Sequence, residues 1–191
     1  MTTVLGIDLG KSLGYGVAGG TDLHAGCCQL FDAWWPLGRS AHILRRKFHD
    51  LIDEFRPDLI GVARPFVRYG RKGGGMLDTP NNLIPQFGAF YLLHEVAEDH
   101  TLPVRVIQES AARSLLLGPD CPRESEAAKQ AVWQACLDRG KRCPTKDASD
   151  ALCIAIAVLE GHDPAAAHEI TPLFAAAPAK RARARRPRKP K

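Results

Sequence analysis

Three aspartates are the residues of this sequence whose type and spacing could support catalysis. Asp8 ends the apolar run that begins at Val4, and Asp147 and Asp150 lie just before another apolar run at residues 151–159. A spacing of three residues places Asp147 and Asp150 on one face of a helix, and a carboxylate in an apolar strand is costly unless it is paired or bound to a metal. Together the three carboxylates would form a site for Mg²⁺, which prefers oxygen ligands and assists phosphodiester hydrolysis.

Each aspartate also has an ordinary structural explanation. Asp8 could cap a hairpin turn, and Asp147 or Asp150 alone could stabilise a helix N-terminus by capping or through the helix dipole. We favour the metal site because Ile7 and Leu9, rather than turn residues, flank Asp8. Two aspartates that together precede an apolar helix are also hard to explain by capping alone.

The elements that must position these aspartates follow from apolar periodicity and from Gly and Pro breaks. We expect strands at residues 3–9, 14–19, 26–34, 58–63 and 102–107, and helices at residues 37–55, 81–98, 110–117, 123–137 and 147–159, with Ser110 as a helix cap. Short Gly-containing turns join the first three strands, which predicts antiparallel hairpins, and helices alternate with strands afterwards. This order predicts an α/β fold with a mixed sheet flanked by helices.

Length and charge divide the chain of 191 residues into a body and a tail. We expect one domain at residues 1–160, followed at residues 161–191 by an Ala/Pro-rich linker and a basic tail. The net charge is +5, yet residues 180–191 hold eight Lys or Arg, and the rest of the chain holds 18 basic against 21 acidic residues. Such a tail should be disordered, and it either binds nucleic acid through its charge or only adds solubility.

Composition argues against membrane, secreted and zinc-finger proteins. The apolar runs are shorter than the roughly 20 residues that a membrane span needs, and no signal peptide is recognisable, so we expect a cytoplasmic protein with no membrane partner. The cysteines form neither a CxxC pair nor a zinc-finger spacing, so we expect free thiols. They are Cys27, Cys28, Cys121, Cys136, Cys143 and Cys153.

Three motifs, taken in order, resemble those of the RuvC family of Holliday junction resolvases, particularly its phage and prophage relatives. GIDLG at residues 6–10, followed by GYGV at residues 14–17, resembles the first hairpin of that family. PDLIGV at residues 57–62 resembles the strand that delivers a catalytic glutamate, and DASDALCIAIA at residues 147–157 resembles the catalytic helix. The helix motif is the most specific of the three, and the similarity covers residues 2–160.

The resemblance implies a ribonuclease H-like mixed sheet and a metal-dependent endonuclease that resolves four-way DNA junctions. A homodimer would nick two strands symmetrically. Asp8, Asp147 and Asp150 would hold Mg²⁺, or Mn²⁺, with two ions per site when the family's glutamate is present. No small-molecule cofactor is implied.

One departure from the family pattern concerns that glutamate, because its position falls on Ala63. Alanine cannot bind a metal, so we expect this chain to be catalytically impaired. Three explanations are open: a substitution made to trap uncut DNA, which we favour, a naturally impaired relative, or replacement by another acid such as Glu109.

The resemblance also implies DNA contacts. Phe66 lies where the family places an aromatic that wedges against bases, and the alternative is a core residue that follows a proline. The loop after Ala63 is basic, which suits phosphate contacts or simple solvation. The candidate DNA-binding residues are Phe66, Arg64, Arg68, Arg71, Lys72, Arg113 and Lys129.

Three alternatives remain. A junction-binding relative without catalysis would keep the fold and explain Ala63. An RNA-processing nuclease of the same fold would use the basic tail equally well. An actin-like ATPase fragment would share only the Asp8 motif, and the sequence lacks the Gly-rich phosphate loop that this class needs.

Overall fold

The computed structural model describes residues 2–10, 12–19, 24–29, 37–65, 67 and 80–160. Its strands are β1 (Val4–Leu9), β2 (Ser12–Ala18), β3 (His24–Gln29), β4 (Leu59–Ala63) and β5 (Val104–Ile107). Its α-helices are α1 (Leu37–Phe55), α2 (Pro80–Asp99), α3 (Glu109–Leu117), α4 (Ser125–Asp138) and α5 (Lys146–Leu159), and the short 3-10 helix η2 (Gly118–Asp120) follows α3. The basic tail lies outside the described residues.

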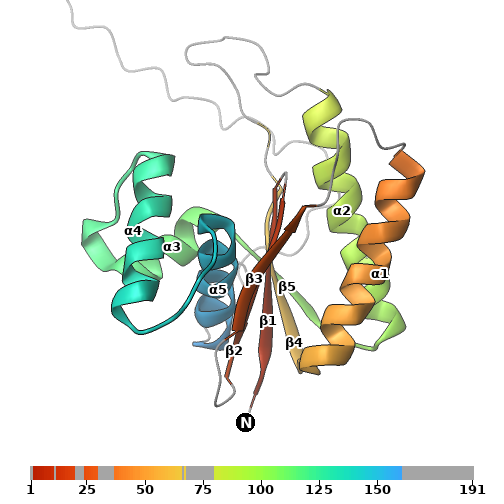
Figure 1. Ribbon diagram of the computed structural model, residues 1–191, viewed down its shortest axis with the longest axis horizontal. Helices are drawn as coiled ribbons and strands as arrows, with labels where there is room; N and C mark the ends of the chain where they lie inside the picture. Colours follow the sequence, from red (N-terminus) through yellow and green to blue (C-terminus); the bar gives the residue numbers. More distant parts are fainter. Residues whose placement is uncertain are drawn as a thin grey trace, which may run out of the picture.

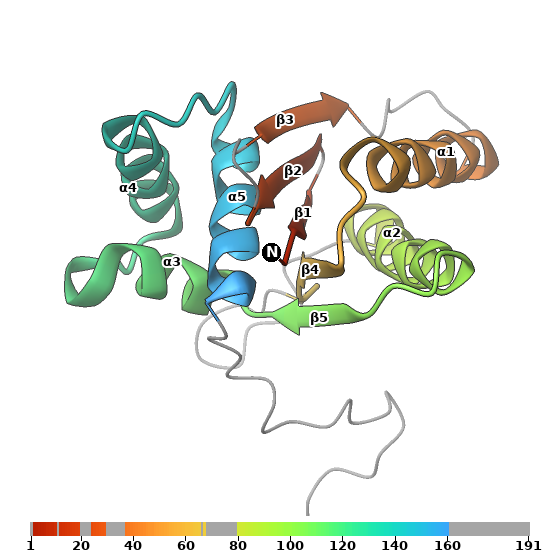
Figure 2. The same cartoon turned by 90° about the horizontal axis from the view of Figure 1, so that it is seen from below.

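The five strands form one mixed sheet in the order β3-β2-β1-β4-β5. β2 pairs antiparallel with both β1 and β3, whereas β4 pairs parallel with β1 and β5 pairs parallel with β4. Helices α1 and α2 cover one face of the sheet, α5 covers the other face, and α3 and α4 lie beyond α5 (Figure 1; Figure 2). The predicted α/β fold with a mixed sheet is therefore confirmed.

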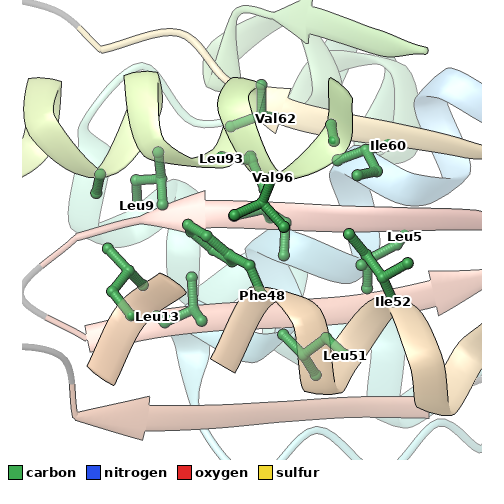
Figure 3. Packing of buried hydrophobic residues seen from close by; sticks show 14 of the residues in the cluster. Leu5, Leu9, Leu13, Phe48, Leu51, Ile52, Ile60, Val62, Leu93 and Val96 are labelled. Carbon is green, nitrogen blue, oxygen red and sulfur yellow. The ribbon is translucent and has the colours of Figure 1, made fainter. Parts of the chain in front are cut away.

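Alternation along β1 separates its core residues from its functional residue. Leu5, Ile7 and Leu9 point to the α1 and α2 side and belong to the larger buried cluster, with Phe48 and Leu93 from the two helices (Figure 3). Gly6 faces α5 instead. Because side chains alternate along a strand, Asp8 also faces α5. The strand pattern thus aims this carboxylate at the helix that carries the other two aspartates.

Glycines allow α5 to lie directly against the sheet. An added Cβ at Gly6 would lie 2.1 Å from the carbonyl oxygen of Ala151, and one at Gly14 would lie 2.2 Å from that of Asp147. Gly14 is also the residue paired with Asp8 across β1 and β2. The absence of a side chain at Gly14 therefore allows the backbone of Asp147 to approach the sheet beside Asp8.

We expect Gly14→Ala to destabilise the fold by about 3 kcal/mol, because the new methyl group overlaps backbone that cannot move independently of α5. Urea unfolding would measure the loss. The matched control is Gly88→Ala in α2, where an added Cβ meets nothing within 4 Å. This control should gain about 0.5–1 kcal/mol from helix propensity. Equal stability of the two variants would contradict the close helix–sheet contact.

Several predicted boundaries are wrong by one or two residues at the start of an element: β2 begins at Ser12, β5 at Val104 and α4 at Ser125, rather than at residues 14, 102 and 123. β3 begins at His24 rather than at residue 26, because its pairing with β2 continues to Val17, and it ends at Gln29, beyond which residues 30–36 are not described. Helix α3 begins at Glu109, after the extended backbone of Gln108, so Ser110 lies inside the first turn and does not cap it.

Two expectations from composition can be compared with the structure. All six cysteines are free thiols, as predicted. Within the part of the chain that the structure describes, no helix is long and apolar enough to cross a membrane.

Candidate metal centre

Asp8 is a buried carboxylate without a protein partner. Asp8 is 7% exposed, and its side chain makes no hydrogen bond or ion pair with any residue that the structure describes. A buried charge of this kind is costly unless a cation compensates it. The side chain lies at the carboxyl end of β1, the central strand, and points toward the first turn of α5.

Asp147 and Asp150 do not cap α5. Thr145 is the N-cap, and its side-chain oxygen accepts a hydrogen bond of 3.1 Å from the backbone nitrogen of Ala148. The cap is thus already supplied, and the two aspartates point toward the sheet. The side chain of Asp150 is fully buried and that of Asp147 is 32% exposed. This arrangement removes the capping explanation for this pair.

The three aspartates meet in one cluster. One carboxylate oxygen from each of Asp8, Asp147 and Asp150 lies within 4.8 Å of the other two. Carboxylate oxygens are the donors that a hard divalent cation such as Mg²⁺ or Mn²⁺ prefers. The unpartnered carboxylate of Asp8 supports the fit, because a bound cation would supply the charge that Asp8 lacks.

Two basic residues also enter the cluster. Lys129 Nζ lies 2.9 Å from Asp147 Oδ1 and 3.5 Å from Asp150 Oδ2. Arg113 donates hydrogen bonds of 2.9 Å to both carboxylate oxygens of Asp150, one from Nε and one from Nη2. Its Nη2 also donates to Glu109. The sequence prediction that Arg113 and Lys129 contact DNA did not anticipate these ion pairs. The four-residue spacing of Glu109 and Arg113 on a helix was the available signal.

The electrostatics of the cluster favour binding a cation. Burial raises the pKa of Asp8 to about 7, with the charges of Asp150 and Asp147 adding to the effect and those of Lys129 and Arg113 opposing it. Burial lowers the pKa of Lys129, but the hydrogen bond to Asp147 and the surrounding carboxylates outweigh burial and leave this pKa raised. Lys129 is therefore a fixed positive charge, whereas Asp8 exchanges a proton near neutral pH.

Metal binding should depend on pH because Asp8 must lose its proton to bind a cation. With the pKa of Asp8 raised to about 7, Mn²⁺ affinity should be constant above pH 8. Affinity should fall below pH 7 by up to about tenfold per pH unit. Calorimetric titration with Mn²⁺ between pH 5.5 and 8.5 would measure this dependence. An affinity that stays level down to pH 5.5 would exclude Asp8 as a ligand with a raised pKa.

No protein-family model matches this sequence, and no curated protein sequence matches it. Solved structures do match. RuvC from Thermus thermophilus in complex with a Holliday junction substrate aligns with a TM-score of 0.62 and 19% identity, over 84% of this chain and 97% of that one. A second Thermus thermophilus RuvC structure aligns with a TM-score of 0.61 and 20% identity, again over 84% of this chain and 97% of that one. The chain has the RuvC fold. The yeast mitochondrial Holliday junction resolvase Ydc2 aligns with a TM-score of 0.53 and 19% identity, over 81% of this chain and 76% of that one.

The RuvC fold confirms the resemblance drawn from the motifs at the level of architecture. Ala63 is the last residue of β4, and its place in the sheet follows from the strand register. Ile7 pairs with Val62, so the next positions, Asp8 and Ala63, lie side by side. Ala63 shares the α5 side of the sheet, because it packs in the buried cluster that includes Leu152 from that helix. A longer acidic side chain at residue 63 would therefore point toward the three aspartates.

The remaining DNA-binding candidates divide into two groups. Arg64 is exposed, and its backbone nitrogen donates to the carbonyl oxygen of Ile107, which continues the pairing of β4 with β5. Its side chain lines a cavity of about 580 Å³ together with Arg113 and Arg123. The other candidates lie outside the described residues and stay predictions: Phe66, Arg68, Arg71 and Lys72.

Proposed function

We propose that this protein is a structure-selective nuclease of the RuvC type that acts on four-way DNA junctions, with its catalysis impaired at Ala63. The observation that carries the proposal is the cluster of Asp8, Asp147 and Asp150 at the carboxyl end of β1 within the RuvC fold. Thermus thermophilus RuvC has been solved with a Holliday junction substrate. The sequence motifs for β1 and α5 lie at this same site.

Asp8, Asp147 and Asp150 are the residues that would hold a divalent cation. Bound there, Mg²⁺ would polarise the scissile phosphate and lower the pKa of an attacking water. Lys129, partly exposed beside Asp147, holds that carboxylate in place and adds positive charge at the mouth of the site. Arg113 fixes the orientation of Asp150 through its two parallel hydrogen bonds.

The surroundings of the cluster suit a DNA backbone. The cavity beside Glu109 is lined by Arg64, Arg113 and Arg123, and by the serines at the start of α3 and α4. Guanidinium groups and hydroxyls are the usual partners of backbone phosphates. We place the strand that leaves the cleavage point along this cavity, with the basic loop and the tail as further contacts.

We infer that the protein works as a homodimer, which would present two sites to the two strands of a junction. Helix α2 offers an exposed apolar face for this contact. Ile84 and Tyr91 are 54% and 55% exposed, and the space at Gly88 between them is open. The spacing of four and three residues places these positions along one side of the helix.

A second candidate is a junction-binding protein without catalysis, which Ala63 specifically favours. Both candidates predict selective binding, so binding must be measured before cleavage. A gel-shift competition in EDTA would compare a four-way junction, a linear duplex of the same sequence and a structured RNA. We expect the junction to bind at least about tenfold more tightly than the duplex. Arg64→Gln should weaken binding, whereas Arg105→Gln, exposed on β5 away from the cluster, should not.

The competition with duplex and RNA distinguishes the substrate classes. Preference for the structured RNA would replace the junction with RNA as the substrate class. Equal affinity for junction and duplex would contradict the proposal, because a basic tail alone binds all polyanions in that way.

A further inference from the structure

Arg113 is a buried guanidinium enclosed by two carboxylates. Its side chain is only 6% exposed, and it contacts carboxylates on two sides, Asp150 and Glu109. Both oxygens of Asp150 are engaged by this one guanidinium. A guanidinium so enclosed is a permanent positive charge, and its Nε and Nη2 donors are already engaged by carboxylates.

The charges of the cluster balance with one divalent cation. Among the residues that the structure describes, the connected carboxylates are Asp8, Glu109, Asp147 and Asp150, and the bases among them are Arg113 and Lys129. Two negative charges remain when all six groups are ionised. One Mg²⁺ or Mn²⁺ neutralises them, and a second ion would leave an excess of positive charge in a largely buried site.

The lack of a carboxylate at residue 63 also favours a single cation. Ala63 lies beside Asp8 and contributes no oxygen, so that side of the site lacks a ligand. On the opposite side of the aspartates, Arg113 already occupies both oxygens of Asp150. Among the described aspartates of the cluster, the carboxylates with the most capacity left for a cation are therefore Asp8, which is unpartnered, and Asp147, which is partly exposed and pairs with Lys129 through one oxygen.

We propose that Arg113, fixed between Glu109 and Asp150, takes the place of a second metal ion, so that each chain binds a single divalent cation at Asp8 and Asp147. This inference rests on the metal-dependent function proposed above. It adds the number of ions and the role of Arg113, and it narrows the direct ligands from three aspartates to Asp8 and Asp147, with Asp150 holding Arg113. Arg113 is here a positioning residue that supplies fixed charge, not a group that touches the substrate.

The test is a Mn²⁺ titration at pH 8. Calorimetry would measure the heat of binding, and electron paramagnetic resonance would measure the concentration of free Mn²⁺. The unmodified chain should bind one ion. Arg113→Gln should bind a second ion, or bind the first at least about tenfold more tightly, because a positive charge near the site is removed. Glu109→Gln, which removes a nearby negative charge, should bind Mn²⁺ about tenfold more weakly. Arg113→Lys keeps the charge and should still bind one ion.

These directions separate the inference from a structural role for Arg113. If Arg113 only supported the fold, Arg113→Gln would lose Mn²⁺ binding, and that result would overturn the inference. Thermal melts in EDTA would show which variants fold. If Arg113→Gln does not fold, the Mn²⁺ affinities of Glu109→Gln and Arg113→Lys test the inference in its place. Two ions in the unmodified chain would overturn the inference alone, whereas no Mn²⁺ binding by any variant would overturn the metal-dependent function as well.

Discussion

Ala63→Glu is expected to raise the rate of four-way junction cleavage in Mg²⁺ by about 10²–10³-fold, the usual worth of one electrostatic group in an active site. Residue 63 ends β4 directly beside Asp8 and shares its side of the sheet, so the new carboxylate would join the cluster. Ala63 is nearly buried, at 7% exposure, and the glutamate must reach outward to the other carboxylates. A fourth ligand at this point would restore the oxygen that the site lacks.

The matched control for this gain is Ala63→Gln, which has the same size and no charge. It should cleave no faster than the unmodified chain, and EDTA should abolish the activity of Ala63→Glu. Single-turnover cleavage of an end-labelled junction would give the rates. If glutamate and glutamine at residue 63 act alike, the charge at this position is not what the site lacks.

Asp8→Asn is expected to stabilise the metal-free protein while removing its response to Mn²⁺. Burial raises the pKa of Asp8 to about 7 and no described residue pairs with it, so the ionised carboxylate destabilises the fold. This penalty is absent below the pKa of the unfolded chain, near 4, and grows as pH rises toward 7. At pH 8 asparagine should therefore gain about 1–3 kcal/mol, or about 2–4 °C in Tm for each kcal/mol.

Thermal melts at pH 5 and pH 8, with EDTA and with Mn²⁺, would test this prediction. The control is Asp58→Asn, because Asp58 is exposed and accepts a hydrogen bond of 2.8 Å from the backbone nitrogen of Thr3 at the other end of the sheet. This control should lose a little stability at both pH values and keep the rise in Tm with Mn²⁺. A lower Tm for Asp8→Asn in EDTA at pH 8 would show that Asp8 has a stabilising partner.

The aspartates were predictable because their local sequence is unusual. Asp8 interrupts an apolar buried strand, and Asp147 and Asp150 share a helix face, so each was a candidate metal ligand by type and position. That α5 packs against β1 and brings the three together required the tertiary structure. The glycines at Gly6 and Gly14 were visible in the sequence as well. Their function as contact points for the backbone of α5 required the tertiary structure.

The ion pairs around the aspartates were not predictable in the same way. Arg113 and Lys129 lie on α3 and α4, and their partners lie on α5, up to 37 residues away. Helix periodicity gives the face of each residue but not the packing of one helix on another. The capping of α5 by Thr145 was also missed, since the aspartates at the same helix end were equally good caps by type.

The most direct test of the central claim is where Ala63→Glu cuts a four-way junction. Each of the four strands would be labelled in turn, and the nicks mapped after one turnover in Mg²⁺. The account predicts two nicks of equal yield at positions related by the two-fold symmetry of the junction, with the linear duplex left intact. Nicks in one strand only, or equal cutting of the duplex, would contradict it.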